Sequence, residues 1–220
     1  MGGHAAGEIA SQIAVSTVEE YVARRMDSDL RPEEIIRYAA QEANSRIFET
    51  QRQKPELEGM GSTLTILSFH DGTYYVAHVG DSRAYLWREG NLDQITRDHS
   101  LVWHLLESGV LRKEELSSHP QKNLITRSIG PHPYVEVDIE KGEAHEGDVF
   151  LLCSDGLADV VPDDCISKIL SNHDKTPQDL CDDLVSAAMN AGAPDNVTVI
   201  VVRLESGEVE EEDTGKFFIK

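Results

Sequence analysis

Three aspartates, Asp81, Asp155 and Asp195, each lie where an apolar, strand-like run of the sequence meets a tight turn. The three segments are AHVGDSRAYLW, DVFLLCSDGL and APDNVTVIVV. Carboxylates that are held at rigid strand ends and aimed at one point form the kind of site that binds a hard cation. These three residues are therefore the candidate metal ligands of the chain.

The residues around the aspartates favour this arrangement. Gly156 lets the backbone bend sharply beside Asp155, so that its carboxylate can point outward from the strand end. Three oxygen ligands from different strands suit Mg²⁺ or Mn²⁺, which bind carboxylates together with several waters. Two such ions about 4 Å apart lower the pKa of a bridging water and polarise a phosphoryl oxygen. That chemistry hydrolyses a phosphate ester without a covalent enzyme intermediate, so no side chain is predicted to be the nucleophile.

The same aspartates have a simpler interpretation. An aspartate in an Asp-Gly or Asp-Asn pair often forms a turn by hydrogen-bonding to its own backbone. No spacing rule in the sequence forces the three residues together. From the residues alone, the metal-site and the turn interpretations both stay open.

Composition and charge restrict the class of protein. The chain has 220 residues, enough for one domain with a full core. Its 20 basic and 40 acidic residues give a formal net charge of −20, which would repel nucleic acid and anionic membrane surfaces. Its apolar stretches are far shorter than the ~20 residues of a membrane span. Three cysteines without metal-like spacing indicate reduced thiols, which are typical of the cytoplasm. We therefore expect a cytoplasmic protein, and from its charge and its short apolar stretches we expect no nucleic-acid or membrane partner. We also expect it to be a monomer.

The apolar pattern along the chain predicts an α+β domain. Helices are expected where apolar residues recur every three or four positions, and strands where short apolar runs are bounded by turn residues. Helices grouped outside antiparallel strands favour a layered fold in which helices flank a β-sandwich. The predicted helices are residues 5–25, 31–51, 99–117, 162–171 and 176–192, and the predicted strands are 62–69, 73–79, 82–88, 92–96, 124–130, 135–142, 148–153 and 195–205.

Several segments, in order along the chain, resemble the bacterial PPM-type (PP2C-like) metal-dependent serine/threonine protein phosphatases. They are MGGHAAGEIAS, EGMGSTLT, AHVGDSRAYLWREGNLDQITRDHS, SHPQKNLITRSIG, GDVFLLCSDGLADVV and APDNVTVIVV. The resemblance implies a four-layer α-β-β-α sandwich over residues 1–204, and we expect residues 205–220 to form a solvated acidic tail. It also implies a centre of two Mn²⁺ or Mg²⁺ ions, with a third, weaker ion on the same face.

The resemblance also assigns roles to residues. Asp155 would bridge the two core ions, Asp195 would be a terminal ligand, and Asp81 would serve the third ion. Asn123 stands where some relatives have a serine that helps to hold the third ion, and its amide oxygen is a weaker substitute.

Substrate-binding residues are not identified by the sequence. Residues 99–134 resemble the mobile flap that covers the substrate cleft in the family. Arg83 and Arg127 could hold an anionic substrate, although a structural ion pair explains each of them equally well.

The beginning of the chain departs from the family pattern. The family segment reads D-G-M-G-G-H, and this chain begins at its methionine. The aspartate and the glycine before that methionine are ligands of both core ions in the family. We therefore expect that Met1 is either an internal methionine taken for a start codon, in which case Asp-Gly is encoded immediately upstream, or the edge of a truncated sequence.

Two hypotheses about function follow. The first is metal-dependent hydrolysis of phosphoserine and phosphothreonine in proteins by a metal-activated water, with phosphorylated proteins as substrates and a Ser/Thr kinase among the partners. The alternative is a non-catalytic pseudophosphatase that binds phosphoproteins or regulators, because the N-terminal metal ligands are absent.

Overall fold

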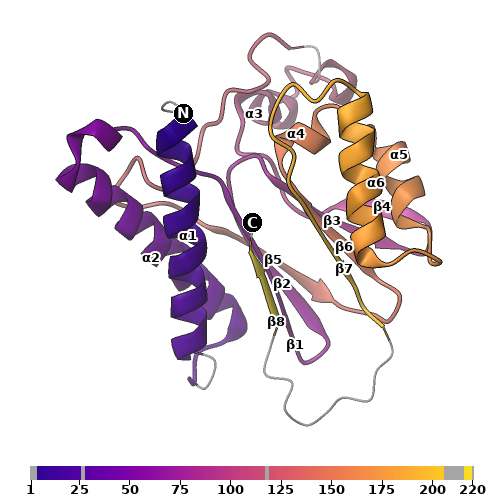
Figure 1. Ribbon diagram of the computed structural model, residues 1–220, viewed down its shortest axis with the longest axis horizontal. Coiled ribbons are helices and arrows are strands. Elements are labelled where there is room, and N and C mark those ends of the chain that lie inside the picture. The colour runs from indigo at the N-terminus through magenta and orange to yellow at the C-terminus, as the bar shows by residue number, and fades with distance from the viewer. Residues whose placement is uncertain (1–3, 26–27, 117–118, 206–215, 220) are drawn as a thin grey trace.

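The computed structural model describes residues 4–25, 28–116, 119–205 and 216–219, which fold into two four-stranded sheets flanked by helices (Figure 1). The strand order is β5-β2-β1-β8 in the first sheet and β4-β3-β6-β7 in the second, and all neighbours are antiparallel. The helices are α1 (His4–Arg25), α2 (Pro32–Gln53), α3 (Leu101–Glu107), α4 (Asp155–Ala158), α5 (Asp163–Leu170) and α6 (Pro177–Asn190), with single 3₁₀ turns η1 (Pro55–Leu57) and η2 (Lys113–Glu115). The strands are β1 (Leu64–His70), β2 (Thr73–Val79), β3 (Arg83–Arg88), β4 (Asn91–Gln94), β5 (Asp138–Glu143), β6 (Val149–Cys153), β7 (Val199–Arg203) and β8 (Lys216–Ile219).

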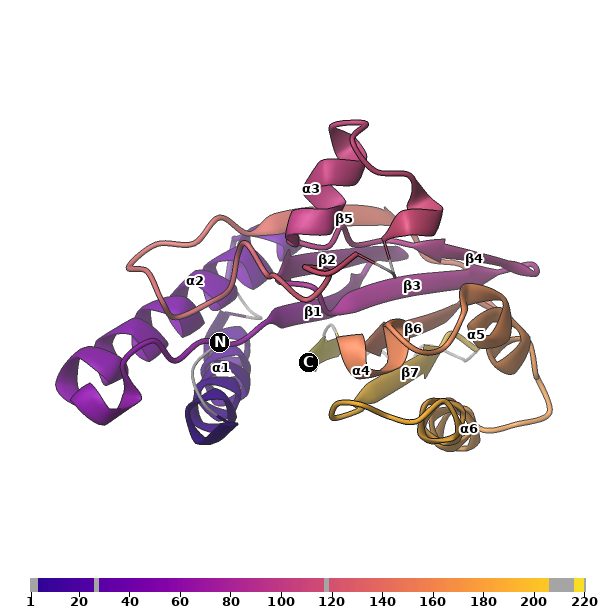
Figure 2. The ribbon, with the colours of Figure 1, turned by 90° about the horizontal axis from the view of Figure 1, so that it is seen from above.

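The elements form four layers, as Figures 1 and 2 show. Helices α1 and α2 cover the outer face of the first sheet through one buried apolar cluster, and α4, α5 and α6 cover the second sheet through another. A third cluster lies between the two sheets and includes Phe150, whose ring packs edge-on against Phe69 and Tyr74 at 5.1 Å. This arrangement confirms the predicted α-β-β-α sandwich.

Two tight turns join consecutive strands into hairpins. Asp71 and Gly72 join β1 to β2 with φ of 47° and 69°, and Glu89 and Gly90 join β3 to β4 with φ of 50° and 87°. Two consecutive residues with positive φ make the type I′ turn, whose twist matches that of the flanking antiparallel strands. These turns fix the register of both hairpins.

The region between β4 and β5 differs from its prediction. The helix expected over residues 99–117 is limited to α3 and the single turn η2. The strand expected over 124–130 is absent from the described residues, where Ile125 and Ile129 form only isolated bridges with Ser100 and Ser62. An apolar run forms a strand only if a neighbouring strand is free to pair along its length, and residues 124–130 have such partners only at Ile125 and Ile129. We call residues 101–116 and 119–124 the flap loop, and its helix α3 projects beyond the sheets in Figure 2.

The C-terminal end corrects the predicted tail. Residues 206–215, with most of the acidic stretch, lie outside the described residues, but Lys216–Ile219 form β8 and pair with β1 from Phe69↔Lys216 to Ile66↔Ile219. The acidic composition hid the short segment KFFI, whose aromatic and β-branched residues favour a strand. β8 also covers an edge of β1 whose backbone groups would otherwise lack a partner strand.

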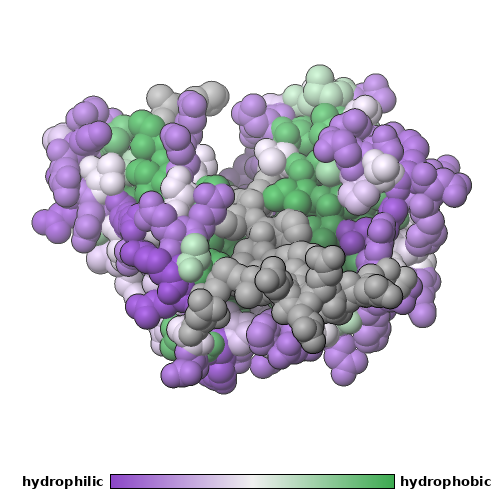
Figure 3. Space-filling view, turned by 60° about the horizontal axis from the view of Figure 1, so that its bottom comes forward, coloured by the Kyte–Doolittle hydropathy of each residue, from purple (hydrophilic) through white to green (hydrophobic). Residues whose placement is uncertain are grey.

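Hydrophilic residues cover much of one face of the molecule. Figure 3 shows hydrophilic residues over most of the outer parts of the molecule on the face that it displays, with hydrophobic residues in smaller areas between them. None of the helices in the described part of the chain combines the length and the hydropathy that crossing a bilayer requires.

Candidate metal centre

The register of the second sheet brings the three predicted ligands to one end of it. Arg83 pairs with Cys153, and Cys153 also pairs with Val199. Continuing the first pairing by two residues past the strand ends places Asp81 opposite Asp155, because antiparallel partners keep a constant sum of residue numbers. Continuing the pairing of Cys153 with Val199 in the same way places the loop that contains Asp195 beside the turn that carries Asp155.

Asp155 is the first residue of α4, directly after β6. Its Oδ1 accepts a hydrogen bond of 2.8 Å from the backbone N–H of Gly156. A Cβ at Gly156 would lie 2.2 Å from the carbonyl oxygen of Asn196, so only glycine allows this close approach of the two loops. The Ser154 hydroxyl completes the contact, because it donates to the Asn196 carbonyl and accepts from the Thr198 N–H, both at 3.1 Å.

Asp195 lies at the solvent-exposed end of this contact. Its Oδ1 accepts a hydrogen bond of 2.7 Å from the N–H of Asn196, the next residue. This is the turn-forming bond that the simpler interpretation predicted. Asp195 is therefore close in the fold to the turn that carries Asp155, but it does not line the pocket that Asp155 faces.

Asp81 lies where the chain crosses from the first sheet to the second, between β2 and β3. Gly80 before it has φ of 119°, and a Cβ there would lie 2.4 Å from the Thr63 side chain. The Gly80 carbonyl accepts from the backbone N–H of His99 at 2.7 Å and from His78 Nε2 at 3.0 Å, and the Gly80 N–H donates to His99 Nδ1 at 3.0 Å. Two buried histidines thus fix the backbone just before Asp81.

Asp81 and Asp155 line one pocket of about 170 Å³ between the second sheet, α4 and the flap loop. Asp81 is half-buried there. Burial and then the negative charge of Asp155 raise the pKa of Asp81 to about 7. The complete lining is Asp81, Arg83, Gln94, Asp98, Ser100, Val102, Trp103, Leu116, Lys122, Asn123, Asp155, Ala158, Asp159 and Asp163.

This donor set fits a hard divalent cation in part. Among the residues that the structure describes, no three acidic, histidine or cysteine side chains meet closely enough to make a metal site by themselves. Mg²⁺ and its relatives usually bind through one or two carboxylates and keep several waters. Two carboxylates that repel each other across a pocket, with the Asn123 amide in the same lining, meet that requirement.

Three further acidic residues line the pocket and were not among the ligands predicted from the sequence: Asp98, Asp159 and Asp163. Asp159 could have been found from its spacing, because Asp155 begins the single turn α4 and Asp159 is its C-cap four residues later, so that the two lie on the same side. Asp98 gave no such signal, since its place depends on the pairing of β3 with β4.

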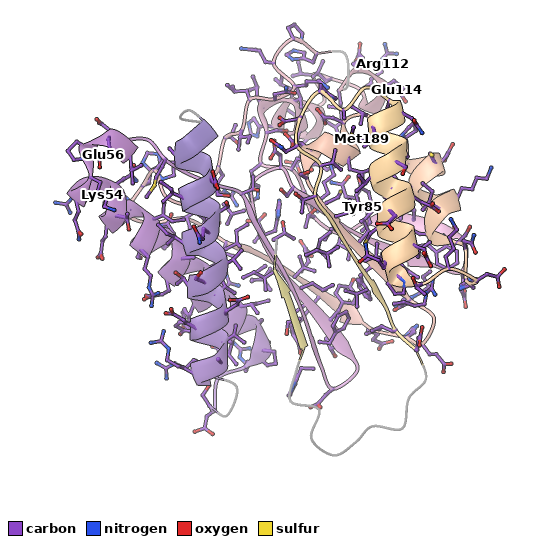
Figure 4. The ribbon with its side chains drawn as sticks, viewed as in Figure 1. Lys54, Glu56, Tyr85, Arg112, Glu114 and Met189 are labelled. Atoms are coloured by element: carbon purple, nitrogen blue, oxygen red, sulfur yellow. The ribbon has the colours of Figure 1, made fainter. Side chains whose placement is uncertain are left out.

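Arg83 is held in a structural ion pair. Its Nε lies 3.0 Å from both carboxylate oxygens of Asp98, and its Nη2 lies 2.7 Å from Oδ2. Nη1 donates to the hydroxyl of Tyr85, which Figure 4 shows beneath α6. Burial opposes the charge of Arg83, but the hydrogen bonds to Asp98 outweigh it and raise the pKa of the guanidinium. The alternative role of Arg83 as a free anion-binding group is thus not favoured.

Arg127 is paired in the same way. Its Nη1 lies 2.5 Å from Asp138 Oδ1, and His99 Nε2 lies 3.1 Å from Asp138 Oδ2. His99 Nδ1 accepts from an N–H, so the neutral ring carries its proton on Nε2 and donates it to Asp138. Burial lowers the pKa of His99 and favours this neutral form. Through Asp138 and His99, Arg127 therefore helps to hold the backbone just before Asp81.

The buried His78 predicts a pH dependence of stability. Burial, and then the nearby His99, lower the pKa of His78 to about 3. In the unfolded chain a histidine takes up its proton below about pH 6.5, so between these values the unfolded state binds more protons and stability falls as the pH falls. We expect this residue to cost roughly 2 kcal/mol between about pH 6.5 and pH 5, an effect that His78→Gln should remove in urea unfolding curves.

The exposed His145→Gln variant is the control for this measurement and should keep the wild-type pH dependence. A His78→Gln variant that loses as much stability as the wild type between these pH values would contradict the assignment.

Comparison with known proteins gives the family. Residues 1–188 match the family described as Protein phosphatase 2C. The chain is 41% identical over 201 residues to the serine/threonine protein phosphatase PstP of Mycobacterium tuberculosis, which is 91% of this chain and 38% of the relative. It is 38% identical over 205 residues to the serine/threonine phosphatase stp of Listeria monocytogenes, covering 92% of this chain and 81% of that protein. This chain belongs to the protein phosphatase 2C family.

The fold of a protein phosphatase 2C relative agrees with this assignment. The crystal structure of the PstP catalytic domain in complex with two manganese ions matches with a TM-score of 0.83 and 38% identity, over 94% of this chain and 85% of that one. The family match therefore confirms the resemblance and the layered fold predicted from sequence. The chain spans 38% of the length of the whole PstP protein.

Proposed function

We propose that this chain catalyses the metal-dependent hydrolysis of phosphoserine and phosphothreonine in proteins. Membership of the protein phosphatase 2C family supports the reaction class. The observation that carries the proposal is the convergence of Asp81 and Asp155 on one pocket, with the loop of Asp195 packed against the turn of Asp155.

The proposed cofactor is Mn²⁺ or Mg²⁺. Asp155 and Asp195 are the proposed ligands of two core ions, and Asp81 with Asn123 the proposed ligands of a third. The two manganese ions in the crystal structure of the PstP catalytic domain support this choice. When bound, such ions supply an activated water and neutralise charge on the phosphoryl oxygens.

The residues of the chain position the reacting groups and limit water. Asp155 is fixed by the N–H of Gly156, and the backbone before Asp81 is fixed by His78 and His99. Val102, Trp103 and Leu116 form an apolar wall on the flap-loop side of the pocket. Such a wall reduces the number of waters that hydrate the carboxylates, and it strengthens electrostatic interactions inside the pocket.

Finer features of the function are proposed from the resemblance. The phosphatase domain comprises residues 1–204 together with β8, which completes the first sheet. The substrates are phosphorylated proteins, among them a Ser/Thr kinase and its targets. The protein acts as a monomer in the cytoplasm.

The proposal is tested with synthetic phosphopeptides. We expect the chain to release phosphate from phosphothreonine and phosphoserine peptides in the presence of Mn²⁺, and EDTA to abolish release because the ions supply the activated water. A matched phosphotyrosine peptide is the control and should be hydrolysed much more slowly. Equal release with and without EDTA would contradict the mechanism, whereas phosphopeptide binding without release would favour the pseudophosphatase alternative.

A further inference from the structure

Asp138 connects the first sheet to the chain crossing that carries Asp81. It is the first residue of β5, and it pairs with His78 of β2 across the sheet. Its Oδ2 lies 3.1 Å from His99 Nε2, and its Oδ1 lies 2.5 Å from Arg127 Nη1. One carboxylate therefore holds an imidazole and a guanidinium side by side, with only 2.9 Å between His99 Nε2 and Arg127 Nη1.

His99 in turn holds the backbone on both sides of Gly80. Its Nδ1 accepts from the Gly80 N–H at 3.0 Å, and its backbone N–H donates to the Gly80 carbonyl at 2.7 Å. That carbonyl belongs to the planar peptide unit that also contains the N–H of Asp81, so its direction fixes the direction in which Asp81 follows. His99 is only 8% exposed, so water does not replace these bonds easily.

The bond to Gly80 requires one tautomer of His99. A neutral imidazole carries one ring proton, and the nitrogen without it is the acceptor. Because Nδ1 accepts from the Gly80 N–H, the proton must lie on Nε2. Arg127 opposes this tautomer, since its Nη1 is also a donor and lies beside Nε2. Asp138 offsets the opposition, because its two oxygens accept from both groups.

We propose that Asp138 is a tautomer lock for His99, and that His99 is a positioning residue that directs Asp81 into the pocket. The contacts run from Asp138 through the imidazole and Gly80 to Asp81, and only Asp81 among these four residues lines the pocket. The effect on a bound ion rests on the proposed function, which assigns a third ion to Asp81. The effect on the tautomer does not depend on that assignment.

Removal of the Asp138 carboxylate should reverse the tautomer. Arg127 Nη1 would then donate to Nε2, and the ring proton would move to Nδ1. Two donors, Nδ1–H and the Gly80 N–H, would face each other, which costs free energy because both are buried. The backbone before Asp81 would lose its fixed direction. Groups that orient a metal ligand without touching the ion typically change its affinity by about 10- to 100-fold.

The first measurement is the tautomer of His99, read from the ¹⁵N shifts of its ring nitrogens at about pH 8, where histidine is neutral. The wild type should carry its proton on Nε2, and Asp138→Leu should carry it on Nδ1. The double variant Arg127→Leu with Asp138→Leu should restore the wild-type tautomer, because it also removes the competing donor. Glu140→Leu removes a carboxylate from an exposed position on the same strand and should have no effect.

The second measurement is Mg²⁺ binding, followed through the backbone amide signal of Asp81. Asp138→Leu should weaken binding by about tenfold. The double variant should recover to within about threefold of the wild type, and Glu140→Leu should stay within about twofold. A purely structural role of Asp138 predicts a different result, in which the additional loss of Arg127 deepens the defect instead of reversing it.

The outcomes distinguish the tautomer lock from the proposed function. A reversed tautomer and weakened Mg²⁺ binding in Asp138→Leu, both recovered in the double variant, support the lock. An unchanged tautomer, an unchanged Mg²⁺ affinity or a double variant that fails to recover would overturn it and leave the proposed function intact. A wild-type His99 with its proton on Nδ1 would overturn it without any variant. An Asp81 amide of the wild type that does not respond to Mg²⁺ would overturn the third ion and the positioning role together.

Discussion

Asp155→Asn is expected to lower the rate of phosphopeptide hydrolysis by about a thousandfold, which corresponds to roughly 4 kcal/mol of lost transition-state stabilisation. The reason is that a neutral amide is a poor ligand for a hard divalent cation, and Asp155 is the proposed ligand shared by the core ions. The fold should survive, because the amide keeps an oxygen that can accept the hydrogen bond from the Gly156 N–H. The measurement is kcat/KM with a phosphothreonine peptide and Mn²⁺, together with Tm.

Asp164→Asn is the matched control for this variant. Asp164 is exposed in the first turn of α5, and it does not line the pocket. It carries the same chemical change and should leave the rate within about twofold of the wild type, as expected of a surface substitution away from the site. An Asp155→Asn enzyme that keeps more than about a tenth of its activity would contradict the assigned role.

Asp98→Leu is expected to destabilise the protein by about 3 to 5 kcal/mol, because it leaves the charge of Arg83 without its partner in a largely buried site. Asp98 is 8% exposed and Arg83 is 19% exposed, and Gln94 donates a further bond of 3.0 Å to Asp98. The free energy of unfolding in urea measures the effect. The double variant Arg83→Leu with Asp98→Leu should recover more than half of the loss, since it removes both charges.

The exposed pair of Arg46 and Glu20 provides the contrast. Arg46 Nη1 lies 2.8 Å from Glu20 Oε2, which is close to the 2.7 Å between Arg83 and Asp98. The side chains of Arg46 and Glu20, however, are 35% and 58% exposed. Solvent screens such a pair, so Glu20→Gln should change stability much less than Asp98→Leu. Equal losses for the two variants, or a double variant as unstable as Asp98→Leu, would show that burial of the Arg83 charge is not the cause.

Local features of the fold could be predicted from the sequence because neighbouring residues determine them. Asp71-Gly72 favours positive φ at both positions and therefore a hairpin. Thr176 and Asp179 satisfy free N–H groups at the start of α6 through a capping box, and Pro177 occupies the first helical position, where its missing N–H costs nothing. The helix boundaries of α2, α5 and α6 accordingly agree with the prediction within a few residues.

Features that depend on distant pairing could not be predicted in this way. The meeting of Asp81 with Asp155 requires the register of β3 on β6, which links residues far apart in the chain. Asp98 enters the pocket only through its bonds to Arg83, and Lys122 only through the path of the flap loop. β8 was missed because its partner β1 lies about 150 residues earlier in the sequence, so that local composition gave the only signal.

The most direct test of the metal centre is the anomalous scattering of manganese in crystals of this chain and of its Asp155→Asn variant, grown with Mn²⁺. We expect an anomalous peak within roughly 2.2 Å of a carboxylate oxygen of Asp155 in the wild type, and its loss in the variant. Manganese bound elsewhere with an empty pocket between Asp81 and Asp155, or a peak that persists in the variant, would contradict it.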